Sequence, residues 1–558
     1  MKESGAKRLV TRRDLLKAGG VAALGSLLYA CSPTATAPTQ TPAAPTKVGG
    51  TPAPTQAPAA STPAAPAATA TPPSAAIKQG GTFTMARTAN NKNLSGIDFA
   101  RGNFSFIRAL YNTLIQLDSS MNPQPQLAEK WEFSPDGLTM TLRLRQGVKF
   151  HSGSDFTSDD VKFSWEFGKD PETGSPQMRS LFSLVKAVNT PDKYSAELKF
   201  DKPVANVFDI LDTLCIFDRT MVDKLSSTDA GSGPFMVEKY VPNADIVMKK
   251  FDGYWDQGKP YMDGYTVKSI PDASAMVINF ESQALDAIWA PPPQEVARLK
   301  QSKGVVADPG AGSQGMFHLM ASVKGDGPLS NPKVRQALNY AIDRARCVKN
   351  ALSDTVPSTC LIWPKGSWAY FEDLEGTYSY NLDKSRQLLK EAGFENGFET
   401  SIVFSGKDNP PQFAIAQIIQ ADLQKLGINA KLEDTEPTLY NTRIRGGDFE
   451  LAVHNYGRAN RDPATTLSGA IIWYPASEKG PIGFDSPDFV KWRDQAATTL
   501  DREQRKPVYR QIQQWSLEQS FSMPIAGNQS FWIYRDYVKG MQYSSESSPY
   551  VSDVWLNK

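Results

Sequence analysis

Residues 32–77 constrain the fold more than any other segment, because they cannot contribute to a packed core. They consist almost entirely of Pro, Thr, Ala, Ser and Gln. Such a composition lacks the large apolar side chains whose burial offsets the entropy of ordering a chain, and it is typical of an extended, disordered tether. Any folded body must therefore be built from the residues that follow, about 78 to 558.

The first thirty residues have the pattern of an export signal. Ala18 to Ala30 is an apolar stretch of about thirteen residues, too short to cross a bilayer as a stable helix. The run Thr11–Lys17, TRRDLLK, resembles the twin-arginine export motif, which serves proteins that fold before export. An ordinary secretory signal that holds two arginines is the alternative. The basic residues that precede the apolar stretch include Lys2, Lys7, Arg8, Arg12 and Arg13.

Cys31 follows the apolar stretch directly, after Leu28-Tyr29-Ala30. This arrangement resembles a lipobox, in which the cysteine is acylated and becomes the new N-terminus, although Tyr29 is bulkier than usual. A cysteine buried in a helix is the alternative, but the tether that follows cannot form a core around it. The sequence therefore predicts a lipid anchor at Cys31 and a body held at a membrane by residues 32–77.

The other three cysteines are Cys215, Cys347 and Cys360, and an odd number excludes a complete disulfide framework. Cys347 and Cys360 could pair in an oxidising compartment. Separate buried thiols are the favoured interpretation.

Composition indicates a soluble body of several lobes without a basic field. The chain has 558 residues, of which 40% are hydrophobic and 10% aromatic, enough for more than one packed core. Its 60 basic and 59 acidic residues almost cancel. Because the export signal holds an excess of the basic residues, the body carries a small negative charge, which argues against nucleic acid as a partner.

Hydrophobic periodicity predicts strands in the first half of the body and alternating helices and strands in the second. Leu138 to Arg145 alternates apolar and polar residues after the turn Ser134–Gly137, as a half-buried strand does. From Asn331 onwards, apolar residues recur at helical spacing, with Asn331 as a cap and Pro332 at the first helical position. The fold class expected from this order is α/β or α+β.

The sequence lacks the motifs of several common enzymes. Gly310–Gly315 fits GxGxxG, but a strand-like run follows it where a dinucleotide site needs a helix. There is no P-loop and no GxSxG elbow, and the three histidines lack metal-ligand spacing. We therefore expect no catalytic residues, no metal site and no cofactor.

Several segments in a fixed order resemble the family 5 extracellular solute-binding proteins, the peptide/nickel-binding group of ABC importers. The segments that carry the resemblance are Leu127–Trp131, Ser134–Gly137, Leu144–Gly153, Asp159–Val161, Gly231–Phe235, Tyr254–Trp255, Val334–Arg344, Asn381–Gly393, Leu426–Ile428, Tyr440 and Asp448–Phe449. They span nearly all of the body.

The resemblance implies an α/β, two-lobed periplasmic-binding-protein clamshell of type II with an extra inserted domain. Lobe I would comprise residues 78–122, 231–317 and 526–558, and the inserted domain residues 123–230. Lobe II would comprise residues 318–525. A ligand would be enclosed where the lobes meet, and lobe closure would present a surface to the permease and ATPase subunits of an importer.

The resemblance also indicates where a ligand would bind. One candidate is the loop after the first strand, Thr88, Ala89 and Asn90, and the other is the segment 454–463, where peptide binders of this family hold the ligand. The residues expected to bind ligand are Thr88, Ala89, Asn90, Tyr456, Gly457, Arg458 and Asn460, together with Trp289, Trp363 and Trp473 as aromatic platforms. Packing in a core is the alternative for each tryptophan, and a solvated loop position is the alternative for Arg458.

One position departs from the family pattern. The aspartate that pairs with a peptide's ammonium group corresponds to Ala459, and a buried ammonium without a carboxylate partner is unfavourable. Peptides are nevertheless the first expected ligands, followed by oligosaccharides or other polyols and then metal chelates. An extracellular hydrolase and a ligand-sensing lipoprotein are the alternatives of other classes. The expected protein is a monomer outside the cytoplasm, anchored to the cell membrane by lipid.

Overall fold

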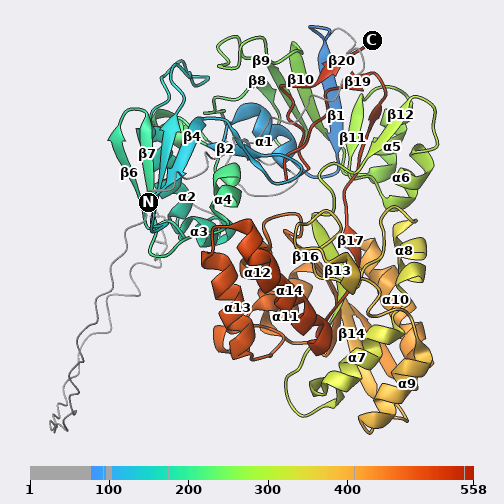
Figure 1. Cartoon of the computed structure of the whole chain (residues 1–558). Coiled ribbons are helices and arrows are strands. Elements are labelled where there is room, and N and C mark those ends of the chain that lie inside the picture. The colour runs from blue at the N-terminus through green and yellow to red at the C-terminus, as the bar shows by residue number, and fades with distance from the viewer. Residues whose placement is uncertain are drawn as a thin grey trace, which may run out of the picture. The chain divides into compact units, whose positions relative to one another are not determined.

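A computed structural model of the chain describes residues 77–558, except 92, 96–102, 174–175, 226, 408 and 546. The predicted export signal, Cys31 and nearly all of the predicted tether lie outside the described residues. The described residues belong to one compact unit, in which three sheets organise three regions (Figure 1).

A seven-stranded sheet organises lobe I. Its strands, in spatial order, are β12 (Val305–Asp308), β18 (Trp532–Arg535), β11 (Ala287–Trp289), β1 (Thr82–Arg87), β10 (Gly264–Ser269), β9 (Asp245–Lys250) and β8 (Phe235–Tyr240). Phe83 and Met85 of β1 pack in a core with helix α1 (Phe104–Leu110), whereas Ala86 packs with α5 (Ala273–Glu281) and α6 (Pro293–Leu299). The alternation of side chains along β1 thus gives the sheet two covered faces.

The inserted domain is a four-stranded antiparallel sheet with helices against it. Its strands, in spatial order, are β4 (Ala128–Phe133), β5 (Thr139–Leu144), β7 (Ser195–Lys199) and β6 (Ala187–Asp192). Its helices are α2 (Ser158–Lys169), α3 (Pro176–Phe182) and α4 (Val207–Thr213). The predicted turn between the first two strands is confirmed, because Gly137 donates to the carbonyl of Ser134 at 2.8 Å with a φ of +70°.

Short strand pairs flank these two sheets. They are β2 (Ile115–Leu117) with β3 (Pro123–Pro125), and β19 (Val538–Lys539) with β20 (Trp555–Leu556).

A five-stranded sheet organises lobe II. Its strands, in spatial order, are β15 (Asn429–Asp434), β14 (Glu399–Phe404), β16 (Leu451–Gly457), β13 (Gly315–Ala321) and β17 (Ser522–Asn528). Leu451 and Val453 of β16 pack toward the helices α7 (Pro332–Ala341), α8 (Arg344–Leu352), α9 (Leu382–Glu391) and α10 (Pro410–Gln424). Ala452 and Tyr456 pack toward α11 (Pro437–Gly446), α12 (Pro463–Gly469), α13 (Pro487–Thr498) and α14 (Arg502–Gln519).

The chain passes between the two large sheets through two short segments. Residues 309–314 join β12 of lobe I to β13 of lobe II, and residues 529–531 join β17 of lobe II to β18 of lobe I (Figure 1). The boundaries expected from the sequence, 317/318 and 525/526, fall inside β13 and β17, a few residues from these connections. Both connections are short, so they are the natural hinge of a two-lobed molecule.

Cys215, Cys347 and Cys360 are buried and free, in agreement with separate thiols. Within the described ranges, no helix combines the length and hydrophobicity that crossing a bilayer requires.

Candidate functional site

A cavity of about 660 Å³ lies beside the carboxyl end of β16 in lobe II. Its wall comes from β16, from α11, from residues 469–474 and, in the inserted domain, from Ser180 of α3. The polar side chains in this wall include Arg445, His454, Asn455, Arg458 and Tyr474. Residues of lobe II and of the inserted domain therefore line the same cavity.

Arg458 has an unusual backbone at this cavity. Its φ is +68°, in the left-handed region that residues with a side chain rarely occupy. Thr466 Oγ1 donates to the Arg458 carbonyl at 2.8 Å, and the amide of Arg461 donates to the same carbonyl at 3.1 Å. The side chain crosses Gly469, where an added Cβ would lie 2.1 Å from Arg458 Nη1. A glycine is therefore required at 469 for this placement of the guanidinium.

His454 is a neutral polar group in the same wall. Burial, and secondarily the charge of Arg445, lowers the pKa of His454 to about 4. Its Nδ1 atom lies 2.8 Å from the hydroxyl oxygen of Tyr440, and this hydroxyl donates its hydrogen to the Val453 carbonyl at 2.9 Å. The ring is therefore held in place and uncharged at neutral pH.

A second cavity, of about 550 Å³, lies where the lobes meet beside the hinge. It is bounded by Thr88 and residues 290–293 of lobe I, by the adjoining ends of α8 and α10 in lobe II, and by residues 527–531. The lining residues that the structure describes carry no ionisable side chain, and several are amides, such as Asn350, Asn409 and Asn528. This space suits a neutral polar or apolar part of a ligand.

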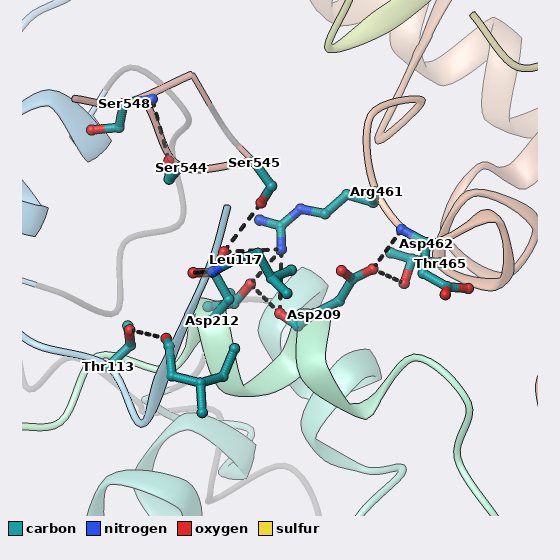
Figure 2. A network of polar contacts seen from close by, with 12 residues as sticks. Thr113, Leu117, Asp209, Asp212, Arg461, Asp462, Thr465, Ser544, Ser545 and Ser548 are labelled. Carbon is teal, nitrogen blue, oxygen red and sulfur yellow. Dashed lines mark hydrogen bonds and ion pairs between the residues drawn. The ribbon is translucent and has the colours of Figure 1, made fainter. Parts of the chain in front are cut away.

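The last part of the segment 454–463, from Arg461 onwards, belongs to a buried polar network that joins lobe II to the inserted domain (Figure 2). Arg461 Nη1 lies 3.1 Å from Thr213 Oγ1 and 3.7 Å from Asp212 Oδ2. The amide of Asp462 and the hydroxyl of Thr465 donate to Asp209 Oδ2 at 3.0 and 2.5 Å. Lobe II and α4 are thus tied together by buried hydrogen bonds.

The charges in this network are partly compensated. Arg108 lies 3.0 Å from Asp212, and Arg505 donates to both oxygens of Asp462 at 2.9 Å. Burial raises the pKa of Asp209 to about 7, against the opposing charge of Arg461, and burial also raises the pKa of Asp212. Protonation of Asp209 or Asp212 therefore changes the charge at the contact between lobe II and the inserted domain.

Of the predicted residues of lobe I, only Thr88 lines the second cavity, and the others lie close to Thr88 in the chain or in the lobe I sheet. Thr88 lines that cavity, while the carbonyl of Ala89 and the side chain of Asn90 accept hydrogen bonds from Ser269 Oγ at 3.1 and 3.3 Å. Trp289 is half-buried, with its ring 6.5 Å from that of Trp532. The Trp289 Nε1 atom is buried and has no hydrogen-bond partner among the described residues.

The predicted residues of lobe II divide into two groups. Tyr456, Gly457 and Arg458 line the 660 Å³ cavity. Asn460 follows them, and both polar atoms of its side-chain amide are buried without a partner among the described residues. Ala459 is fully buried, and its amide donates to the Gln314 carbonyl at 3.3 Å.

Trp363 and Trp473 lie elsewhere. Both are 0% exposed in the core between the lobe II sheet and α11–α14, where Trp363 packs against Tyr509 and Trp473 against Phe489 and Phe521. Their placement corresponds to the packing alternative. The reason is that the residues around them form a closed apolar layer that a linear sequence does not reveal.

The sequence did not indicate Arg445, Tyr474 or Gly469, nor residues 527–531 at the end of β17 and in the connection to β18. No motif marks them, because each comes from a different element and only packing brings them together. A partial signal existed for Arg461, which lies inside the predicted ligand segment 454–463 but is not among the residues expected to bind ligand.

The sequence of this chain is similar to those of known solute-binding proteins. Residues 122–471 match the model of the bacterial extracellular solute-binding proteins, family 5. The chain is 30% identical over 472 residues to the dipeptide-binding protein of Escherichia coli K12, with 77% of this chain and 86% of that protein covered. It is 28% identical over 464 residues to heme-binding protein A of Haemophilus influenzae, with 77% and 84% covered.

Solved structures show the same architecture. The periplasmic binding protein DppA of Helicobacter pylori, in complex with the peptide STSA, has a TM-score of 0.71 and 25% identity, with 86% of this chain and 99% of that chain covered. HbpA2 of Haemophilus parasuis has a TM-score of 0.76 and 25% identity, with 85% and 100% covered.

Proposed function

The chain belongs to the bacterial extracellular solute-binding proteins of family 5, and from this premise we propose that it captures a peptide between its lobes and delivers it to an ABC importer. Its fold is the two-lobed α/β fold of type II periplasmic binding proteins. The family consists of binding components of importers that act outside the cytoplasm, and the chain is a binding protein and not an enzyme.

The buried side-chain oxygen of Asn455, a residue that lines the 660 Å³ cavity, is the observation that carries the peptide assignment. It has no partner among the described residues, and neither polar atom of the Asn460 amide, which lines neither of the two cavities, has one either. Buried polar atoms without partners are unfavourable. A peptide bond supplies one donor and one acceptor, so a ligand backbone along this segment would satisfy such amides.

The proposed contacts come from both lobes. Thr88, Ala89, Asn90 and Trp289 would meet the ligand from lobe I. Tyr456, Gly457, Arg458 and Asn460 would meet it from lobe II. Trp363 and Trp473 are left out of this set, because both are fully buried in the lobe II core and support the segment from beneath.

An oligosaccharide or other polyol is the second candidate. The uncharged, amide-lined cavity of about 550 Å³ favours it, because hydroxyl groups pair well with side-chain amides and Trp289 lies nearby in lobe I. A metal chelate is the third candidate. A hydrolase is the alternative of another class, and turnover of a substrate would identify it.

We also propose that the chain is exported by its first thirty residues and acylated at Cys31. The lipid and the tether of residues 32–77 would keep the two lobes near the importer while allowing them to reach it. The basic n-region, the apolar stretch and the cysteine after Ala30 support this proposal.

Thermal unfolding of the full-length protein tests the proposed function. The probes are short peptides, oligosaccharides and nickel chelates, each with the same buffer control. A ligand at 100 times its Kd adds about 2.7 kcal/mol of stability, which raises the Tm measurably. Stabilisation by peptides alone would support the assignment, and stabilisation by sugars without any effect of peptides would contradict it.

A further inference from the structure

Two arginines, Arg445 and Arg458, line the 660 Å³ cavity, and no Asp or Glu is among the lining residues that the structure describes. We propose that this cavity is an oxyanion subsite, in which Arg458 and Arg445 select ligands that carry a carboxylate or a phosphate. The inference rests on the proposed function, because it names the chemical class of ligand that the same site accepts.

The backbone conformation of Arg458 directs its side chain toward this wall. The residue is held at a φ of +68°, a conformation that is unfavourable for an arginine and that persists only where its surroundings enforce it. Two donors fix its carbonyl, Thr466 Oγ1 and the amide of Arg461. Gly469 provides the clearance, because any Cβ there would meet the guanidinium.

Arg445 adds a second cation from a different element. It is an exposed residue in the last turn of α11, and its charge contributes to the lowered pKa of His454 in the same wall. His454 is neutral at physiological pH and the other polar groups of the wall, such as Asn441, Asn455 and Tyr474, are neutral as well. The ionisable side chains that are charged in the described lining are therefore both cations, and a planar guanidinium matches the geometry of a carboxylate or phosphate.

The same wall does not provide for a ligand ammonium group. Ala459 is 0% exposed, and its methyl group is packed in the lobe II core. An ammonium group placed here would lose its hydration and be repelled by the arginines. The described lining offers no carboxylate to compensate for either effect. The ligand is therefore expected to enter this cavity with its acidic end.

Four forms of one tripeptide, Ala-Ala-Ser, test the inference by titration calorimetry with the full-length protein. The forms are the free acid, its N-acetyl derivative, the C-terminal amide, and the same amide with a phosphorylated serine. Amidation is expected to weaken binding about tenfold or more, whereas N-acetylation changes it less than about threefold, since only the acid meets the arginines. Restored binding of the phosphorylated amide would support a phosphate-accepting subsite, and its absence would support a carboxylate-specific one.

Variants locate the effect. Arg458→Gln and Arg445→Gln should each weaken the free acid and leave the amide unchanged, so that the discrimination between them falls. Arg458→Lys keeps a charge without the planar fork and should retain part of the discrimination. Arg386→Gln is the control for loss of one positive charge, because Arg386 is exposed on α9 and pairs with Asp383 of its own helix. The Tm of each unliganded variant shows that it is folded.

The outcomes separate the two proposals. Equal binding of acid and amide by the unaltered protein, or full discrimination by folded Arg458→Gln, would overturn the oxyanion subsite and leave the peptide function standing. Absence of binding by all four forms would overturn the peptide assignment and this inference with it.

Discussion

The amide of Asp462 donates a hydrogen bond of 3.0 Å to Oδ2 of Asp209, and this bond joins lobe II to the inserted domain. Asp462 lies two residues after Asn460, the last of the proposed ligand-binding residues, and inside the segment 454–463. The proposed binding residues and this contact between lobe II and the inserted domain are therefore adjacent in the chain. Further bonds strengthen the contact, including that from Asn206 Nδ2 to Thr465 Oγ1 at 2.8 Å and that from the amide of Ala205 to the carbonyl of Ala497 at 2.9 Å.

Asp209→Asn should remove a pH dependence of stability. Burial raises the pKa of Asp209 from 3.8 to about 7, so the folded protein holds this proton more tightly than the unfolded chain does. The resulting stability is complete below about pH 4 and is lost as the pH rises toward about 7. Over this range the Tm of the unaltered protein should fall relative to that of Asp209→Asn, whose amide oxygen still accepts both hydrogen bonds. Scanning calorimetry from pH 4 to 8 measures this, and parallel curves would contradict it.

Arg461→Leu should destabilise the contact between the lobes strongly. The Arg461 side chain is only 3% exposed and lies beside Asp209 and Asp212. Removing one partner of a buried ion pair typically costs about 3–5 kcal/mol, because it leaves buried negative charge with less compensation. Denaturant unfolding gives the value. The control is Lys333→Gln, whose exposed pair with Glu391 is expected to contribute less than about 1 kcal/mol, and equal losses in the two variants would argue against the network.

Gly469→Ala should impair ligand binding more than folding. The added Cβ would lie 2.1 Å from Nη1 of Arg458, so the flexible arginine side chain must leave its place in the cavity. We expect the affinity for a bound peptide to fall about tenfold, or about 1.4 kcal/mol, as measured by calorimetry. Gly446→Ala is the matched control, since nothing lies within 4 Å of its Cβ position. Unchanged affinity in Gly469→Ala would show that the position of Arg458 does not matter.

Cys31→Ser should release the protein from the membrane. Lasting attachment requires more than one acyl chain, and the proposed acylated cysteine is the position that would supply them. After cell fractionation, the unaltered protein should be found with the membranes and the Cys31→Ser variant in the soluble extracytoplasmic fraction. Thr41→Ala, in the tether, should behave like the unaltered protein. Membrane retention of Cys31→Ser would exclude the anchor.

Local structure was predictable where the signals for it are local. The alternation in residues 138–145 predicted β5, and the cap at Asn331 predicted α7, where Asn331 Oδ1 accepts from the amide of Lys333 at 2.9 Å. The strand after the GxGxxG-like run is likewise confirmed as β13. In each case a few neighbouring residues carry the preference for one conformation.

The candidate site was predictable only in part. The segment from Tyr456 to Arg458 lines a cavity, and ligand binding by it stays a prediction. Trp363 and Trp473 have the same general appearance in the sequence as Trp289, yet they are fully buried and Trp289 is not. Burial depends on which elements pack over a residue, and this information is absent from its neighbours in the chain.

The division into signal, tether and body stays a prediction, because the signal and nearly all of the tether lie outside the described residues. The sequence by itself determined the family and those strands and helices whose signals are local, such as β5 and α7. These follow from composition, periodicity and motif order, which are properties of contiguous residues. Only the tertiary structure decided that Arg445 from α11, Arg458 after β16 and Gly469 at the end of α12 meet at one cavity, and that Arg461 enters a carboxylate cluster on α4. The physical reason is that side chains distant in the chain acquire a shared environment only when sheets and helices pack.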